Sequence, residues 1–248
     1  MKRLAFDIGN SCTKVGIFFD KNIICTKKIL SGNEAEIVDI VKNQAIAEVI
    51  ISSVVKEKEE KIKEIISPYI EKIFFLDSSM KLPFENLYQT PETLGKDRIA
   101  AVAGAQFLFP DKNILVIDAG TAITYDLLVD NKYLGGNISA GLDIRLKSLN
   151  FFTSQLPLVE IDEKEIDFFG KNSREAILAG AINGILFEIE GYRDFCKKNF
   201  KKNLTIITGG NANYFVKKIK SPIFANSNLV IIGLKRILEF NNEDIRKK

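Results

Sequence analysis

Short apolar runs alternate with amphipathic stretches along the chain, and turn residues separate them. The apolar runs predict strands, and apolar residues spaced three or four apart predict helices. In the first half, strands are expected at 3–7, 13–19, 23–30, 49–52 and 73–76, and helices at 34–43, 57–70 and 97–109. In the second half, a hairpin begins at 113, with strands at 133–138 and 204–208 and helices at 142–152, 173–198, 212–219 and 229–240. The mixture indicates an α/β protein with two lobes, residues 1–112 and 113–248.

One pattern occurs twice: an apolar strand, an Asp-x-Gly turn and a second apolar strand. The first copy turns at Asp7-Ile8-Gly9-Asn10 and the second at Asp118-Ala119-Gly120-Thr121. A carboxylate at a strand end, followed by a glycine turn with exposed N–H groups, can bind phosphate oxygens and their metal. Each copy alone also fits an ordinary hairpin with Gly and Asp as turn formers. The repetition favours two half-domains that hold one nucleotide.

Two local patterns concern helices. Ala100, Ala101, Ala103, Gly104 and Ala105 give the helix at 97–109 a small-residue surface that permits close backbone approach. Asn172 with Glu175 predicts a capping box at the start of the helix at 173–198.

Composition narrows the possible chemistry. The chain has 248 residues and no histidine, which excludes a Ser-His-Asp triad and any His-ligated metal site. A base would therefore be a carboxylate, which suits phosphoryl transfer, where positioning and electrostatics dominate. Three cysteines without Cys-x-x-Cys spacing suggest neither a disulfide framework nor zinc. The net charge of +3 comes from interspersed Lys and Glu, and the basic run 197–202 fits a solvated helix end better than a nucleic-acid site. No apolar run approaches a membrane span, so we expect a cytoplasmic protein without membrane or nucleic-acid partners.

Four motifs in this order resemble the type III pantothenate kinases of the acetate and sugar kinase, Hsp70 and actin superfamily. They are Asp7-Ile8-Gly9-Asn10-Ser11-x-x-Lys14, Gly95-Lys96-Asp97-Arg98, Asp118-Ala119-Gly120-Thr121-Ala122-x-Thr124 and Thr208-Gly209-Gly210-Asn211-Ala212. The resemblance implies an actin-like duplicated fold of two ribonuclease H-like lobes, each a mixed sheet flanked by helices. It also implies ATP-dependent phosphorylation of pantothenate to 4'-phosphopantothenate, the first step of coenzyme A biosynthesis.

The resemblance implies a nucleotide site. The residues that would contact ATP or its phosphates are Asp7, Ile8, Gly9, Asn10, Ser11, Cys12, Thr13, Lys14, Gly120, Thr121, Gly209 and Gly210. Asp7 would orient Mg²⁺ through phosphates or water, and Asp118 would bind a monovalent cation, K⁺ or NH₄⁺.

Asp97 would be the general base that takes the proton of the pantothenate hydroxyl. Taken alone, an Asp in the first turn of a helix is more often a cap or a dipole partner. The other residues that would contact pantothenate are Tyr88, Gly95, Lys96, Arg98 and Ser173. Without the family, Arg98 fits a surface ion pair, Tyr88 a loop aromatic and Ser173 a helix cap. The segment 135–142 departs from the family pattern, because Ala140 stands at the usual proline.

The family also implies a homodimer. The apolar runs 177–182 and 184–187 leave few polar residues on the long helix, which a partner subunit or the lobe's own sheet could cover. Two other functions fit parts of the pattern: a kinase of the same superfamily acting on a sugar or short acid, and a non-catalytic regulatory relative.

Overall fold

The computed structural model describes residues 2–9, 12–20, 22–53, 55–161, 167–220 and 222–246. These residues form two compact units. Unit 1 comprises residues 1–112, 130–135 and 228–248, and unit 2 comprises residues 113–129 and 136–227. The division differs from the continuous lobes 1–112 and 113–248 expected above, because the C-terminal helix packs within unit 1.

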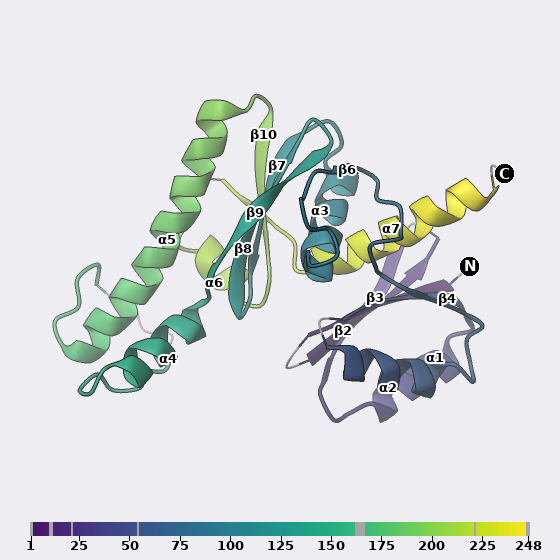
Figure 1. Cartoon of the computed structure of the whole chain (residues 1–248). Helices are drawn as coiled ribbons and strands as arrows, with labels where there is room; N and C mark the ends of the chain where they lie inside the picture. Colours follow the sequence, from purple (N-terminus) through teal and green to yellow (C-terminus); the bar gives the residue numbers. More distant parts are fainter. Residues whose placement is uncertain are drawn as a thin grey trace. The chain divides into compact units, whose positions relative to one another are not determined.

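Unit 1 contains a sheet in the order β3-β2-β1-β4-β5. Its elements are β1 (Lys2–Ile8), β2 (Cys12–Phe19), β3 (Asn22–Leu30), α1 (Ala35–Asn43), β4 (Ile46–Ser53), α2 (Lys56–Ile66), β5 (Lys72–Phe75), β6 (Glu85–Asn86), α3 (Lys96–Leu108) and α7 (Leu229–Arg246). Figure 1 shows α1 and α2 on one side of this sheet. Alternate residues of β1 point to opposite faces. Leu4, Phe6 and Ile8 are buried in one core with residues of α1 and α2. Asp7 therefore lies on the other face of β1, and α7 packs on that face at Gly16, where a Cβ would meet Ile231 at 2.2 Å.

Helices α3 and α7 touch backbone to backbone. A Cβ at Gly104 would come within 2.3 Å of the Leu229 carbonyl oxygen, and one at Gly233 within 1.7 Å of the Ala100 carbonyl oxygen. The close approach predicted from the small residues of α3 is therefore confirmed. It requires glycine on both helices, since even a methyl group would force them apart.

Unit 2 holds most of a second sheet, in the order β11-β10-β7-β8-β9-β6. Its elements are β7 (Asn113–Ala119), β8 (Ala122–Val129), β9 (Lys132–Ala140, which begins in unit 1), α4 (Leu142–Phe152), α5 (Ser173–Asn199), β10 (Asn203–Thr208), α6 (Ala212–Val216) and β11 (Phe224–Ala225). The Asn172 side chain accepts a hydrogen bond from the Glu175 N–H at 3.0 Å, which confirms Asn172 as the helix cap. The predicted capping box is not complete, because the Glu175 carboxylate accepts from the Lys171 N–H at 2.8 Å and not from that of Asn172. Ile177, Leu178, Ile182 and other apolar residues of α5 are buried in the core of unit 2.

The two sheets share one topology. In unit 1, β1 pairs antiparallel with β2 and parallel with β4. In the second sheet, β7 pairs antiparallel with β8 and parallel with β10. The order β3-β2-β1-β4-β5 therefore matches β9-β8-β7-β10-β11, and each predicted Asp-x-Gly turn joins the two central antiparallel strands. The duplication seen in the sequence is a duplication of the fold.

Candidate active site

The first Asp-x-Gly turn ends β1. Asp7 lies directly across from Lys14 of β2, and the Gly9 N–H donates to the Cys12 carbonyl oxygen at 3.0 Å. The Ile8 side chain is buried in the core of unit 1, so this residue can offer a ligand only its backbone. Asn10 and Ser11, which the sequence also assigned to phosphate, lie outside the described residues.

Asp97 lies in the first turn of α3, after the N-cap residue Gly95. One Asp97 carboxylate oxygen accepts the Arg98 N–H at 2.9 Å. A Cβ at Gly95 would lie 2.6 Å from that same oxygen, which explains the glycine in this motif. The Asp97 carboxylate is therefore held by local backbone geometry at the start of the helix.

Asp7 and Asp97 come close enough within unit 1 for the charge of Asp97 to shift the pKa of Asp7. Burial, together with the smaller effect of the negative charge of Asp97, raises the pKa of Asp7 from 3.8 to about 7, and the positive charge of Lys14 opposes the shift. Two carboxylates from distant parts of the sequence thus share one site. Such a pair can divide its roles between binding a cation and accepting a proton.

Arg98 and two tyrosines form a cluster beside Asp97. The guanidinium of Arg98, which is only 5% exposed, donates to the Tyr133 hydroxyl at 3.0 Å. It also lies over the Tyr88 ring, 5.7 Å from the centroid, and the two tyrosine rings are 6.1 Å apart. The structure therefore brings together Tyr88 and Arg98, as a shared pantothenate site would require. Arg98 is not the surface ion pair considered as its alternative. Tyr133 was missed, because nothing in its local sequence distinguishes it from a core aromatic.

In unit 2, the second Asp-x-Gly turn packs against two further glycines. The Gly120 N–H donates to the Ala122 carbonyl oxygen at 3.1 Å, as in the first turn. Gly209 has φ +96°, and a Cβ there would lie 2.5 Å from the Asp118 carboxylate. A Cβ at Gly141 would lie 2.2 Å from the Thr121 carbonyl oxygen. The predicted nucleotide residues of this unit are thus neighbours, and Gly209 is required by its positive φ and by the Ala119 backbone 2.6 Å from where its Cβ would be.

Local packing does not dictate the residue type at Gly210 or at Ser173. A Cβ at Gly210 would meet no atom within 4 Å, so packing does not demand glycine there. Ser173 is the first residue of α5 and is exposed, next to the Asn172 cap. Its hydroxyl is therefore not needed as the cap, since Asn172 fills that role.

Thr124 was part of a motif but was given no role by the sequence. It pairs across the strands with Asp118, and it is 9% exposed. Its hydroxyl oxygen is one of the few buried side-chain atoms without a hydrogen-bond partner in the described part of the chain. A buried hydroxyl normally has a partner, so this oxygen is available to a ligand beside the Asp118 carboxylate.

Across the residues that the structure describes, no three Cys, Asp or Glu side chains gather as a metal site. Within the same described ranges, no helix is long and apolar enough to cross a membrane.

Comparisons with solved structures show the fold. A protein from Campylobacter jejuni, described as a Baf family transcriptional activator, aligns with TM-score 0.64 and 22% identity over 97% of this chain and 99% of its own. A Sinorhizobium meliloti protein, described as a 2-dehydro-3-deoxygalactonokinase, aligns with TM-score 0.60 and 13% identity over 96% and 98%. The predicted actin-like α/β fold is confirmed.

Comparisons of sequence are more specific. A type III pantothenate kinase of Bacteroides fragilis is 43% identical over 241 residues, which are 96% of this chain and 98% of that protein. One from Cytophaga hutchinsonii is 37% identical over 239 residues, with 96% and 99% covered. The model of the type III pantothenate kinase family matches residues 3–194. With this match over most of its length, and with the carboxylates and glycine turns described above, the chain belongs to the type III pantothenate kinase family.

Proposed function

We propose that this kinase works in the cytoplasm and transfers the γ-phosphoryl group of ATP to the primary hydroxyl of pantothenate, with Asp97 as general base. The product is 4'-phosphopantothenate, and the reaction begins coenzyme A biosynthesis. The observation that carries the proposal is the convergence of Asp7 and Asp97 in unit 1, where Asp97 raises the pKa of Asp7. One carboxylate serves the metal-bound nucleotide, and the other accepts the hydroxyl proton.

The acceptor side of the site consists of Asp97, Arg98 and Tyr88. Arg98 offers a planar fork of N–H donors that matches the pantothenate carboxylate or a phosphoryl oxygen. Tyr133 and Tyr88 fix the plane of that fork. Gly95 and Lys96 contribute the backbone before Asp97, and Ser173, which stands at a substrate position of the family motif, contributes a hydroxyl. With the acceptor so placed, Asp97 takes the proton as the hydroxyl oxygen attacks phosphorus.

The donor side consists of the two glycine turns. In unit 1, the backbone of Gly9, Cys12 and Thr13 and the ammonium of Lys14 face phosphate oxygens. In unit 2, Gly120 and Thr121 contact phosphate, and Gly209 and Gly210 adjoin the adenosine. Mg²⁺, when bound with ATP, offsets the negative charge of the phosphates, and Asp7 orients it through water or phosphate.

A monovalent cation, K⁺ or NH₄⁺, fits the residues around Asp118. The carboxylate supplies one negative charge, and the buried Thr124 hydroxyl opposite it supplies a neutral oxygen without a hydrogen-bond partner within the described chain. Oxygen donors of this kind suit hard cations. Asp118 and Thr124 would hold the cation and place its charge next to the second phosphate turn.

The test is an assay of the purified protein with ATP, Mg²⁺ and pantothenate. We expect phosphorylated pantothenate in K⁺ or NH₄⁺ and sharply less in Na⁺ at equal ionic strength. K⁺ should also raise the melting temperature more than Na⁺ does, since a bound ligand stabilises the folded state, and Asp118→Asn should abolish that difference. Equal activity and equal melting temperatures in both salts would contradict the cation site.

The same assay separates the two alternatives. A sugar or short-acid kinase would phosphorylate those acceptors in preference to pantothenate, and a regulatory relative would phosphorylate none. The likeness to the Campylobacter jejuni protein does not favour regulation, because at 22% identity it speaks for the fold alone. The retained Asp7, Asp97 and Asp118 favour catalysis.

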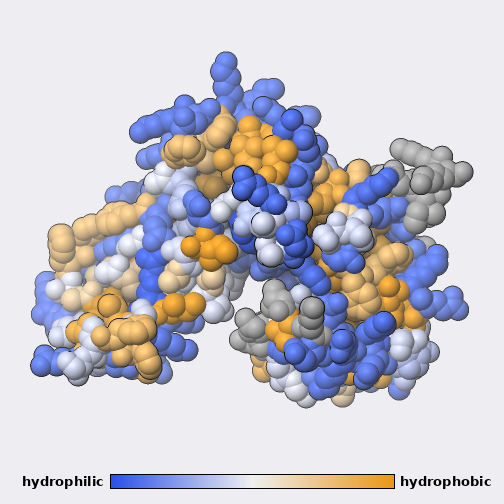
Figure 2. Space-filling model, viewed as in Figure 1, coloured by the Kyte–Doolittle hydropathy of each residue, from blue (hydrophilic) through white to orange (hydrophobic). Residues whose placement is uncertain are grey.

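A homodimer is supported by exposed aromatic residues of unit 2. Much of the apolar surface of α5 is covered within unit 2 itself, as one alternative allowed. Five phenylalanines around α4 and α5 nevertheless remain between 58% and 80% exposed: Phe151, Phe152, Phe168, Phe169 and Phe187. Figure 2 shows apolar atoms gathered on this part of the surface. Exposed apolar patches of this kind mark interaction sites, and a second copy of the chain is the partner we propose.

Light scattering should therefore give a mass of two chains of 27.8 kDa each. The double variant Phe151→Asp/Phe152→Asp should be monomeric, because charges cannot be buried in an apolar interface without a partner. Phe19→Asp, at a half-exposed phenylalanine of unit 1, should leave the mass unchanged. A wild-type protein that scatters as one chain would refute the dimer.

A further inference from the structure

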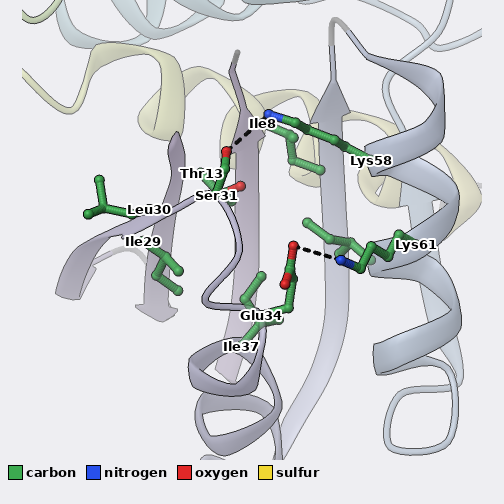
Figure 3. Close-up of a pocket in the computed structure, with 10 residues that line it drawn as sticks. Ile8, Thr13, Ile29, Leu30, Ser31, Glu34, Ile37, Lys58 and Lys61 are labelled. Atoms are coloured by element: carbon green, nitrogen blue, oxygen red, sulfur yellow. Dashed lines mark hydrogen bonds and ion pairs between the residues drawn. The ribbon is translucent and has the colours of Figure 1, made fainter. Parts of the chain in front are cut away.

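The first turn of α2 contacts the phosphate turn through Lys58. Its ammonium donates to the Gly9 carbonyl oxygen at 3.1 Å and to the Ser31 hydroxyl at 3.1 Å. Gly9 belongs to the turn between β1 and β2, and Ser31 follows β3. Figure 3 shows a small pocket of unit 1 that is lined by the ends of β1, β2 and β3 and by α1 and α2. Lys58 extends from α2 across this pocket towards the end of the sheet. One charged side chain thus ties the phosphate turn to a helix and to a neighbouring strand.

The next residue of α2 contacts the segment that carries the general base. The Glu59 carboxylate lies 3.0 Å from the Lys96 ammonium, with only 20% and 29% of the two side chains exposed. Lys96 is the first residue of α3 and immediately precedes Asp97. Lys58 and Glu59 therefore connect α2 to each of the two segments that supply the carboxylates of the site.

This arrangement follows from helix geometry. Consecutive residues of an α-helix point about 100° apart around its axis. Two neighbours on one turn can therefore reach two different segments but not each other. Neither residue belongs to a motif of the sequence, and the assigned roles of the site do not use them.

The rate of phosphoryl transfer depends strongly on the positions of the reacting groups, because a displacement of about 1 Å can lower the rate on the order of 100-fold. A helix that holds both segments sets the place of the nucleotide phosphates and of the base. We propose that Lys58 and Glu59 are positioning residues, Lys58 for the phosphate turn at Gly9 and Glu59 for the start of α3. The inference rests on the proposed placement of ATP at Gly9 and of pantothenate at Asp97.

The test compares Lys58→Met and Glu59→Gln in steady-state kinetics with both substrates varied. Lys58→Met should raise KM for ATP roughly tenfold and leave KM for pantothenate unchanged, as for the loss of a hydrogen bond to a charged group. Glu59→Gln should lower kcat or raise KM for pantothenate by a similar factor and leave KM for ATP unchanged. Lys58→Arg should have a KM for ATP close to that of the wild type, since arginine keeps a charged donor at the same place.

Lys61→Met is the matched control. Lys61 lies three residues further along α2, lines the same pocket and pairs with Glu34 at 3.0 Å, with its side chain 57% exposed (Figure 3). It touches neither carboxylate segment in any described contact, so both KM values should stay at the wild-type level. Melting temperatures of all four variants show whether a change is local.

The outcomes separate the inference from the proposed function. If both KM values change together with a large fall in melting temperature, or if neither changes, Lys58 and Glu59 do not position the site. If Lys58→Met instead changes the kinetics with pantothenate and Glu59→Gln changes KM for ATP, the positioning role holds and the assignment of the half-sites is wrong. A wild-type protein that does not phosphorylate pantothenate would refute the proposed function before any variant is compared.

Discussion

Asp97→Asn should keep the fold and the binding of ATP but remove most of the turnover. The amide has the shape of the carboxylate and still offers an oxygen to the Arg98 N–H, which Asp97 binds at 2.9 Å. It cannot accept the proton of the pantothenate hydroxyl. The loss in kcat should be on the order of 10²–10⁴-fold, the usual contribution of a general base. Single-turnover assays with saturating ATP and pantothenate measure it directly.

The control for this variant is Asp39→Asn, at an exposed aspartate of α1 in the same unit. It makes the same chemical change away from the site and should leave kcat unaffected. An Asp97→Asn enzyme with near-normal turnover and a wild-type melting temperature would end the assignment of Asp97 as base.

Asp7→Asn should lower kcat/KM for MgATP on the order of 10–100-fold, the cost typical of losing a group that orients a metal. KM for pantothenate should change little. Tyr88→Ala should raise KM for pantothenate and leave kcat/KM for MgATP nearly unchanged, because the Tyr88 ring packs against Arg98 and Tyr133 on the acceptor side. Tyr69→Ala, at an exposed tyrosine of unit 1, is the control for the loss of an aromatic ring. If Asp7→Asn altered only the pantothenate response, the two half-sites would be misassigned.

Asp7→Asn should also change how stability depends on pH. The folded protein holds the Asp7 proton up to about pH 7, whereas the unfolded chain releases it near 3.8. Between these values the folded state binds more protons, so Asp7 lowers the free energy of unfolding as the pH rises from about 4 to about 7. The neutral amide removes this penalty. Without ligands, the variant should melt above the wild type at pH 8, and the gap should narrow towards pH 4.

The sequence predicted the repeated part of the fold well, because that part is local. Each Asp-x-Gly turn joins two apolar runs, and this alone specifies the β1–β2 and β7–β8 hairpins. Helix ends were harder to place. The helix expected at 57–70 ends at Ile66, because Pro68 has no N–H to donate to the Glu64 carbonyl oxygen, which accepts from the Ser67 hydroxyl instead.

Contacts between distant residues could not be predicted in the same way. The small residues of α3 indicated that a neighbour comes close, but nothing near them identifies α7 as that neighbour. Tyr133, Lys58 and Glu59 are ordinary residues of a strand and a charged helix, and only the folded chain brings them to Arg98, Gly9 and Lys96. Motifs mark residues that contact ligands, whereas residues that support those contacts carry no such mark.

The packing of α7 on β2 and α3 has a consequence for biosynthesis. A ribosome makes the chain in order, and domains that are complete in sequence can fold as they emerge. The segments of unit 2 end at residue 227, before α7 has been made. Until residues 229–246 follow, Gly16 and the Ala100–Gly104 surface of α3 lack their cover. Synthesis of unit 1 therefore starts first but its packing is completed last, and the face of α3 and β2 that α7 covers stays open until the end of the chain emerges.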